Sequence, residues 1–124
     1  MSRAGEEPTP QSFFGGFPDG LALFDAVRAA VETIGAFDLR VTTSQIAFRR
    51  GRGFAYVWRP GQYVHSEVPA VLSIVLPREV SSHRFKSVAR PSTTVWMHHL
   101  ELFRTSQIDD EVRDWLAEAY AHAR

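Results

Sequence analysis

The amino-acid sequence predicts an α+β fold: a two-layer sandwich in which an antiparallel sheet of four to five strands carries an N-terminal and a C-terminal helix on one face. Three observations predict it. Helical periodicity occurs near the two ends of the chain, alternating or short apolar runs fill the middle, and most connections between these runs are short. Consecutive strands with short connections pair most simply as an antiparallel meander, and two amphipathic helices can then cover the same face.

The first helix is predicted over residues 20–34, with Asp19 as its N-cap and Gly35 as the left-handed residue that ends it. Its apolar side chains are spaced three or four residues apart, as one helical face requires: Phe24, Val27, Val31 and Ile34. For the last helix, Ser106 is the predicted N-cap, and Asp109 at the third position favours the helix dipole. The apolar stripe of that helix consists of Ile108, Val112, Trp115, Leu116 and Ala119.

Between the helices, period-two alternation and short apolar runs predict the strands. They are expected at residues 37–41, 45–50, 54–59, 71–76 and 95–103, the first two of which would form one interrupted strand or two separate ones. Residues 78–94 are polar and are expected to form a long connection without a strand.

The stretch IAFRRGRGFAYVWRP, residues 46–60, predicts a β-hairpin with a three-residue loop from Gly51 to Gly53 and Gly53 in the left-handed position. This loop would pair Phe48 with Tyr56, and it would place Tyr56 and the neighbouring Trp58 on the face covered by the helices. The outer face would then carry the alternate residues of both strands: Ala47, Arg49, Ala55, Val57 and Arg59.

The composition is that of one folded domain. Of 124 residues, 44% are hydrophobic and 12% aromatic, enough for a core without disulfides or metal. Fourteen basic and fourteen acidic side chains balance, so any nucleic-acid binding must use a local patch. The absence of cysteine excludes disulfides, thiolate metal sites and a thiol nucleophile.

The location and the domain limits are also expectations. The sequence contains neither an apolar run of about 20 residues nor a signal-peptide core at its start, and with the absence of cysteine this predicts a cytoplasmic protein without a membrane span. Residues 1–11 are expected to form a disordered tail, and residues 12–124 a single domain.

Several phrases are similar to those of a known family. They are FFGGFPDGLALFDAVRAAVETIG, VTTSQIAFRRGRGFAYVWRP, LSIVLPREVSSHRFKSV, WMHHLELF and IDDEVRDWLAEAY. Together they resemble the bacterial domain-of-unknown-function family 5655 (DUF5655), over about residues 12–120. Relatives usually have a basic residue where this chain has Thr43, and often an arginine at Gln45. The resemblance implies no activity, because no function is established for that family.

Three hypotheses follow for the function. The first is a non-catalytic binding or interaction module, self-associating as a homodimer, because the outer sheet face mixes small apolar with charged groups. Its contacts would include Arg49, Arg59, Met97, His99 and Glu101. A plain solvated sheet face explains the same pattern.

The second hypothesis is phosphate or nucleic-acid binding by a cationic patch on the hairpin and the long connection, formed by Arg49, Arg50, Arg52, Arg84 and Lys86. Against it, phosphate loops normally lead into a helix, whereas this loop leads into a strand. The third hypothesis is a small enzyme with His99 and Glu101 as acid-base groups. Since the neighbouring residues His98 and His99 would point to opposite faces of a strand, no metal site is expected. The sequence also has neither a P-loop nor a dinucleotide fingerprint, and no cofactor is expected.

Overall fold

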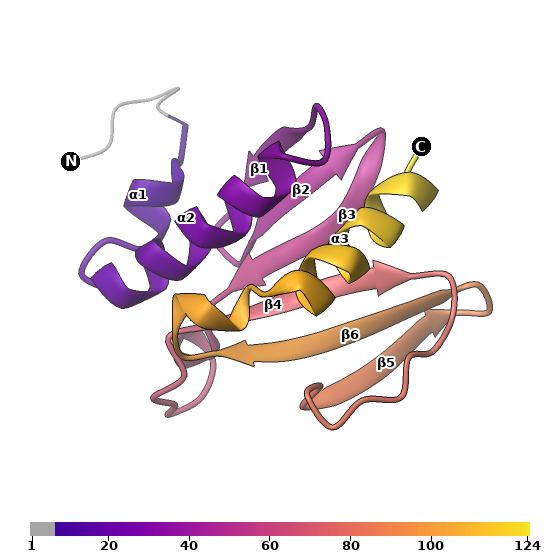
Figure 1. The fold of residues 1–124 in the computed structure, drawn as a ribbon. Helices are drawn as coiled ribbons and strands as arrows, with labels where there is room; N and C mark the ends of the chain where they lie inside the picture. Colours follow the sequence, from indigo (N-terminus) through magenta and orange to yellow (C-terminus); the bar gives the residue numbers. More distant parts are fainter. Residues whose placement is uncertain (1–6) are drawn as a thin grey trace.

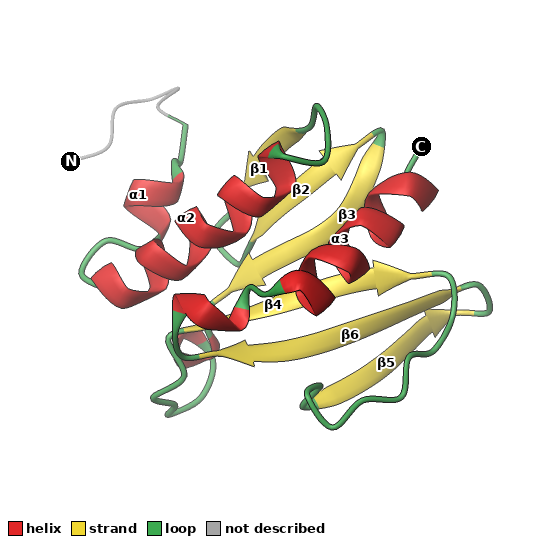
Figure 2. Ribbon diagram, viewed as in Figure 1, coloured by secondary structure: helices red, strands yellow, loops and turns green. Residues whose placement is uncertain are grey.

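The computed structural model describes residues 7–124 and contains, within that range, one antiparallel six-stranded sheet in the order β1-β2-β3-β4-β6-β5. Helices α2 and α3 lie side by side across one face of the sheet, with α1 next to the start of α2 (Figure 1). Figure 2 shows both long helices, α2 and α3, on this one face of the sheet. The elements are α1 Pro10–Phe13, α2 Pro18–Glu32, β1 Asp38–Val41, β2 Ile46–Arg50, β3 Arg52–Trp58, η1 Pro60–Gln62, β4 Ala70–Leu76, β5 Ser87–Ser92, β6 Val95–Leu102, η2 Thr105–Gln107 and α3 Asp110–His122.

The α+β class is confirmed, but the predicted number of strands is wrong. The missed strand is β5, which lies in the connection expected to be irregular and pairs with β6 at the edge of the sheet. Its sequence, SVARPS, is polar, and only Val88 is partly buried. A proline is tolerated on an edge strand because one side of that strand has no hydrogen-bonding neighbour. The sequence of β5 therefore contains no apolar pattern that would predict a strand.

The helix starts also differ from the prediction. Pro18 is the first residue of α2, a position where the missing N–H of proline has no cost, so Asp19 lies in the first turn instead of capping the helix. Helix α3 is capped by Asp109, which accepts a hydrogen bond from the Val112 N–H at 3.1 Å, whereas the predicted cap Ser106 lies in η2. Of the predicted tail, residues 1–6 lie outside the described residues, and Pro10 and Gln11 already belong to α1.

The register of the β2–β3 hairpin differs from the prediction by one residue. Ile46 pairs with Val57, Ala47 with Tyr56 and Phe48 with Ala55. The left-handed residue of the tip is Gly51, with φ of 76°, and not Gly53. Between Phe48 and the next residue of β2 the register shifts by one, so that β3 contains a β-bulge.

This bulge decides which side chains of β3 enter the core. Phe54 and Ala55 are adjacent in sequence, yet both are buried, at 1% and 0% exposure, and Val57 is buried with them. Two neighbouring residues can face the same side only where the strand alternation is interrupted. Tyr56 and Trp58 consequently lie on the outer face, while Ala55 and Val57 are in the core. The prediction had these two pairs on the opposite faces and was wrong.

Candidate ligand-binding face

A row of side chains crosses the face of the sheet opposite α2 and α3, from one edge to the other. Its members are direct partners on successive strands: Arg40, Ala47, Tyr56, Ser73, His99 and Ser87. The small side chains of Ala47 and Ser73 stand on either side of Tyr56 in this row. The outer face is therefore hollowed around the phenol ring.

Two hollows meet at Tyr56, and we call them together the outer groove. One, of about 330 Å³, is lined by Gln45, Tyr56, Trp58, Ser73, Met97 and His99. The other, of about 490 Å³, shares Gln45 and Tyr56 and has arginines in its wall, namely Arg40, Arg49 and Arg52. The groove thus has an aromatic part and a cationic part, with Tyr56 between them.

Hydrogen bonds between side chains hold the aromatic part. The Trp58 indole N–H donates to Ser73 Oγ at 2.9 Å, and Ser73 Oγ lies 2.7 Å from His99 Nδ1. Since the serine hydroxyl has a single proton, all three groups are satisfied when that proton goes to His99 Nδ1 and the imidazole carries its own on Nε2. Burial, and secondly the neighbouring His98, lower the pKa of His99 below its ordinary value of 6.5. The neutral ring is thereby favoured.

Glycine 53 makes room for the ring of Tyr56. A Cβ atom at Gly53 would overlap the phenol oxygen of Tyr56 and lie 2.7 Å from its Cζ atom. Only a residue without a side chain lets the phenol lie along the strand at this position. Beyond Trp58, the Tyr63 ring follows with its centroid 6.3 Å from that of Trp58, and Tyr63 is 60% exposed.

The arginines of the cationic part have few protein partners. Within residues 7–124, the ion pairs closer than 4 Å do not include Arg40, Arg49 or Arg52. Asp38 is the partner of Arg49 in the β1–β2 register but is not within that distance. Arg49 makes one long hydrogen bond, of 3.4 Å, to the carbonyl of Gly51. Two guanidinium groups, those of Arg40 and Arg49, are thus available to an anion.

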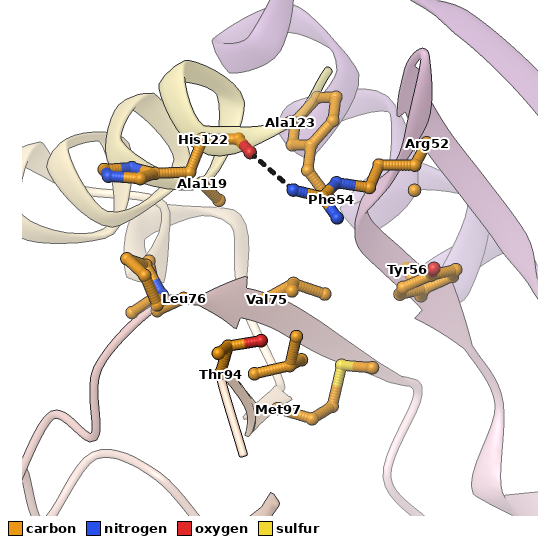
Figure 3. A pocket seen from close by; sticks show the side chains of 13 residues that line it. Arg52, Phe54, Tyr56, Val75, Leu76, Thr94, Met97, Ala119, His122 and Ala123 are labelled. Carbon is orange, nitrogen blue, oxygen red and sulfur yellow. Dashed lines mark hydrogen bonds between the residues drawn. The ribbon is translucent and has the colours of Figure 1, made fainter. Parts of the chain in front are cut away.

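Arg52 stands at the border between the outer groove and a third hollow. It donates to the carbonyl oxygen of His122 at 3.1 Å, near the end of α3 (Figure 3). The third hollow, of about 250 Å³, lies beside that contact, and Tyr56 and Met97 form part of its wall as well as part of the outer groove. The groove therefore extends toward the tip of the β2–β3 hairpin.

Several predicted site residues lie where they were expected. Arg49, Met97, His99 and Glu101 are on the outer face. Arg59 is not: the one-residue change of register turns it to the helix side, where its guanidinium carbon lies 3.7 Å from the centre of the Phe17 ring. The contact set proposed from the sequence is therefore divided between two faces.

The predicted anion-binding set is likewise divided. Arg50 donates to the Tyr120 carbonyl at 3.0 Å and stacks on the Tyr120 ring, which places its positive charge at the carboxyl end of α3. Arg84 donates to Asp109, Glu111 and the Gln107 carbonyl, and the hydrogen bond to Glu111 is the main reason that the pKa of Arg84 is raised. Lys86 lies 3.7 Å from Glu101. Of this set, only Arg49 and Arg52 line the outer groove.

The two adjacent histidines point to opposite faces, as predicted. His98 is fully buried, accepts the Val80 N–H at Nε2 (2.9 Å) and donates from Nδ1 to the Trp96 carbonyl (3.1 Å). Burial is the main cause that lowers the pKa of His98. On the outer face, the hydrogen bonds of the described residues do not join His99 to Glu101, whose carboxylate is paired with Lys86.

Sequence reasoning missed Arg40, Gln45, Tyr56, Trp58 and Ser73 as members of the groove. The alternation of β3 correctly put Tyr56 and Trp58 on one face, but the bulge made that face the outer one and not the helix-covered one. The signal for Ser73 was a single polar residue in the apolar run VLSIVL, and its burial at 2% exposure requires a hydrogen-bonding partner.

The comparisons with known proteins address the family alone. A family model described as "Domain of unknown function (DUF5655)" matches residues 12–123. The curated proteins and the solved structures contain no match to the chain. Among residues 7–124, no helix combines the length and the hydrophobicity that crossing a bilayer requires.

Proposed function

The chain belongs to the DUF5655 family, and we propose that it is a non-catalytic binding module whose outer groove holds an anionic ligand with a flat ring. The observation that carries the proposal is the position of Tyr56, which lines both the arginine-bearing hollow and the hollow of Trp58 and His99. A ring stacked on Tyr56 would have its negative group within the cationic part. A cytoplasmic location and a bacterial origin stay predictions from the sequence.

The chemistry of the groove supports binding over catalysis. Ser73 is buried and its oxygen already accepts the Trp58 N–H, which leaves it poorly placed as a nucleophile. Glu101, the proposed acid-base partner of His99, is engaged by Lys86. Aromatic rings and guanidinium groups, in contrast, bind flat anions without further activation.

Self-association is the second candidate, because the outer face is broad and partly apolar. In a two-fold dimer the same surface meets itself, so the arginines of the cationic part would approach those of the other copy; of the acids on this face, Asp38 lies beside Arg49 and Glu101 is paired with Lys86. This repulsion favours ligand binding over the homodimer. Sedimentation at increasing protein concentration separates the two: a mass that stays monomeric contradicts the dimer, and a rise that Arg49→Glu strengthens supports it.

Titration with adenosine 5′-monophosphate, followed by the amide resonances of ¹⁵N-labelled protein, tests the binding proposal. We expect shifts around Tyr56, Trp58 and His99, weaker with adenosine than with the monophosphate, and reduced in Arg49→Ala. The matched control is Arg28→Ala, which removes an exposed arginine from α2 on the other side of the molecule. The titration is repeated with a pyrimidine monophosphate. The proposal is contradicted if neither nucleotide shifts these resonances, or if Arg49→Ala and Arg28→Ala reduce the shifts equally.

A further inference from the structure

We infer that the outer groove binds a single strand of nucleic acid, with bases stacked on Tyr56 and Trp58 and phosphates beside Arg40 and Arg49. The inference rests on the proposed function and names its ligand class. Four observations carry it: the spacing of the rings, their continuation by Tyr63, the polar groups along the groove, and the charge at one end.

The spacing of the rings selects a single strand. Tyr56 and Trp58 are two residues apart on β3 and face the same side, so the Cα atoms that carry the two rings are about 6.7 Å apart. Neighbouring bases in a duplex are stacked about 3.4 Å apart. Bases that lie on both rings must therefore be unstacked from each other, which a single strand permits and a duplex resists.

The aromatic track continues beyond the sheet. Tyr63, in the segment after η1, places a third and more exposed ring next to Trp58. The segment is held against the β1–β2 connection by a 2.8 Å hydrogen bond from the Gln62 side chain to the Thr43 carbonyl. The Tyr63 and Trp58 rings meet at an interplanar angle of 60°, so a base stacked on Tyr63 would be turned relative to a base on Trp58, which a flexible single strand permits.

The groove also presents polar groups to the edges of stacked bases. When the Ser73 hydroxyl donates to His99 Nδ1, the imidazole offers its Nε2–H as a donor beside the Trp58 ring. Gln45, at the meeting point of the two hollows, adds an amide that both donates and accepts. These groups match base edges, whereas a purely lipid or inorganic anion would leave them unused.

The charge of the groove complements a phosphate backbone. Arg40, Arg49 and Arg52 line its cationic part, and the nearest acid in the register is Asp38. Two to three phosphate contacts predict that log K falls with log salt concentration at a slope of about −1.4 to −2. With a formal net charge of zero, the chain offers no wider field to add to this local one.

Fluorescence anisotropy tests the inference with labelled single-stranded DNA and RNA of mixed sequence and roughly eight nucleotides, within the usual range of site sizes. The same sequence annealed to its complement is the competitor. We expect the single strand to bind tighter than the duplex, with the salt slope above. Preference for RNA or for DNA supports the inference equally and identifies the sugar that is recognised.

Variants locate the binding. Tyr56→Ala is expected to weaken it by about 5- to 160-fold, whereas Tyr56→Phe, which keeps the ring, retains it. Arg49→Ala is expected to reduce the salt slope by about 0.7, and Arg28→Ala on α2 to leave it unchanged. An equal loss in the alanine and phenylalanine variants at Tyr56, or in the two arginine variants, would overturn the inference.

The comparison with mononucleotides separates this inference from the proposed function. If adenosine 5′-monophosphate binds in the groove but the oligonucleotides bind no tighter than it does, the nucleic-acid inference fails and the proposed function stands. If neither the monophosphates nor the oligonucleotides bind, both fail. Binding of the duplex as tightly as the single strand would also overturn the inference, because both rings cannot then be occupied.

Discussion

Ser73 and His99 face each other on the neighbouring strands β4 and β6, and 2.7 Å separates Ser73 Oγ from His99 Nδ1. The same serine oxygen accepts the indole N–H of Trp58 on β3. Side chains thus join the three neighbouring strands β3, β4 and β6 on the face opposite α2 and α3. The arrangement positions the ring of Trp58 at the floor of the outer groove, and all its groups are satisfied when His99 carries its proton on Nε2.

Removal of the central hydroxyl should destabilise the fold. In Ser73→Ala the Trp58 N–H and His99 Nδ1 lose their partner in a buried position, and we expect a loss of about 1–3 kcal/mol in the free energy of unfolding. Urea denaturation measures it. Ser81→Ala, an exposed serine in the connection before β5, is the control and should be nearly neutral. Equal stability of Ser73→Ala and the unchanged protein would show that the network contributes nothing.

A second prediction concerns the tip of the hairpin. Gly51 has a positive φ, and a Cβ atom there would lie 2.7 Å from the carbonyl carbon of Arg124. Gly51→Ala should therefore cost more than the roughly 1–2 kcal/mol of left-handed backbone alone. Gly16→Ala isolates the backbone cost, because Gly16 also has a positive φ but nothing within 4 Å of the added atom. The two variants should differ in urea denaturation, and deletion of Arg124 should remove the difference.

Burial should distinguish two arginine–carboxylate contacts. The side chain of Arg84 is 20% exposed and joins the connection before β5 to the start of α3 through Asp109 and Glu111. Because its hydrogen bonds are charged and partly shielded from water, Arg84→Ala should lower the free energy of unfolding by about 1.5–3 kcal/mol. Arg78→Ala, which removes an exposed bidentate contact to Glu118, should cost less. The reverse order would contradict this assignment.

The histidines of β6 predict a dependence of stability on pH. Burial lowers the pKa of both His98 and His99 in the folded chain, so the unfolded chain binds more protons between the folded values and about 6.5. The free energy of unfolding should therefore be largest above about pH 6.5 and fall as the pH decreases below it. Urea denaturation at a series of pH values measures this fall. His98→Gln, with a side chain that does not titrate, should reduce it; stability that does not change below pH about 6.5 would refute the prediction.

Alternation along a strand correctly predicted the placement of β6. His98 lies in the core and Met97, His99 and Glu101 on the outer face, because β6 pairs without interruption along β4 over seven consecutive partners. The same rule failed on β3, where Phe54 is an extra residue relative to β2. The alternation along one strand does not show where a bulge will occur, because the bulge is stabilised by contacts with residues distant in the sequence.

Those distant contacts are visible around Phe54. Its ring meets Tyr120 of α3 edge-on, 5.5 Å between centroids, while Ala55 pairs with Ile74 of β4. Both requirements are met only when the two neighbours face the same side. The candidate site depends on the β-bulge at Phe54, because a strand without the bulge would place the rings of Tyr56 and Trp58 in the core.

The sequence by itself determined the α+β class, the helix-forming ends and the family, because hydrophobic periodicity and turn residues act locally. Only the tertiary structure decided which face of β3 is exposed, that residues 87–92 form a sixth strand, and that Arg50, Arg59 and Arg84 serve protein contacts while Arg40 and Arg49 line the groove. These outcomes depend on which partners a segment meets across the fold, and the free energy of such contacts is not contained in any one segment.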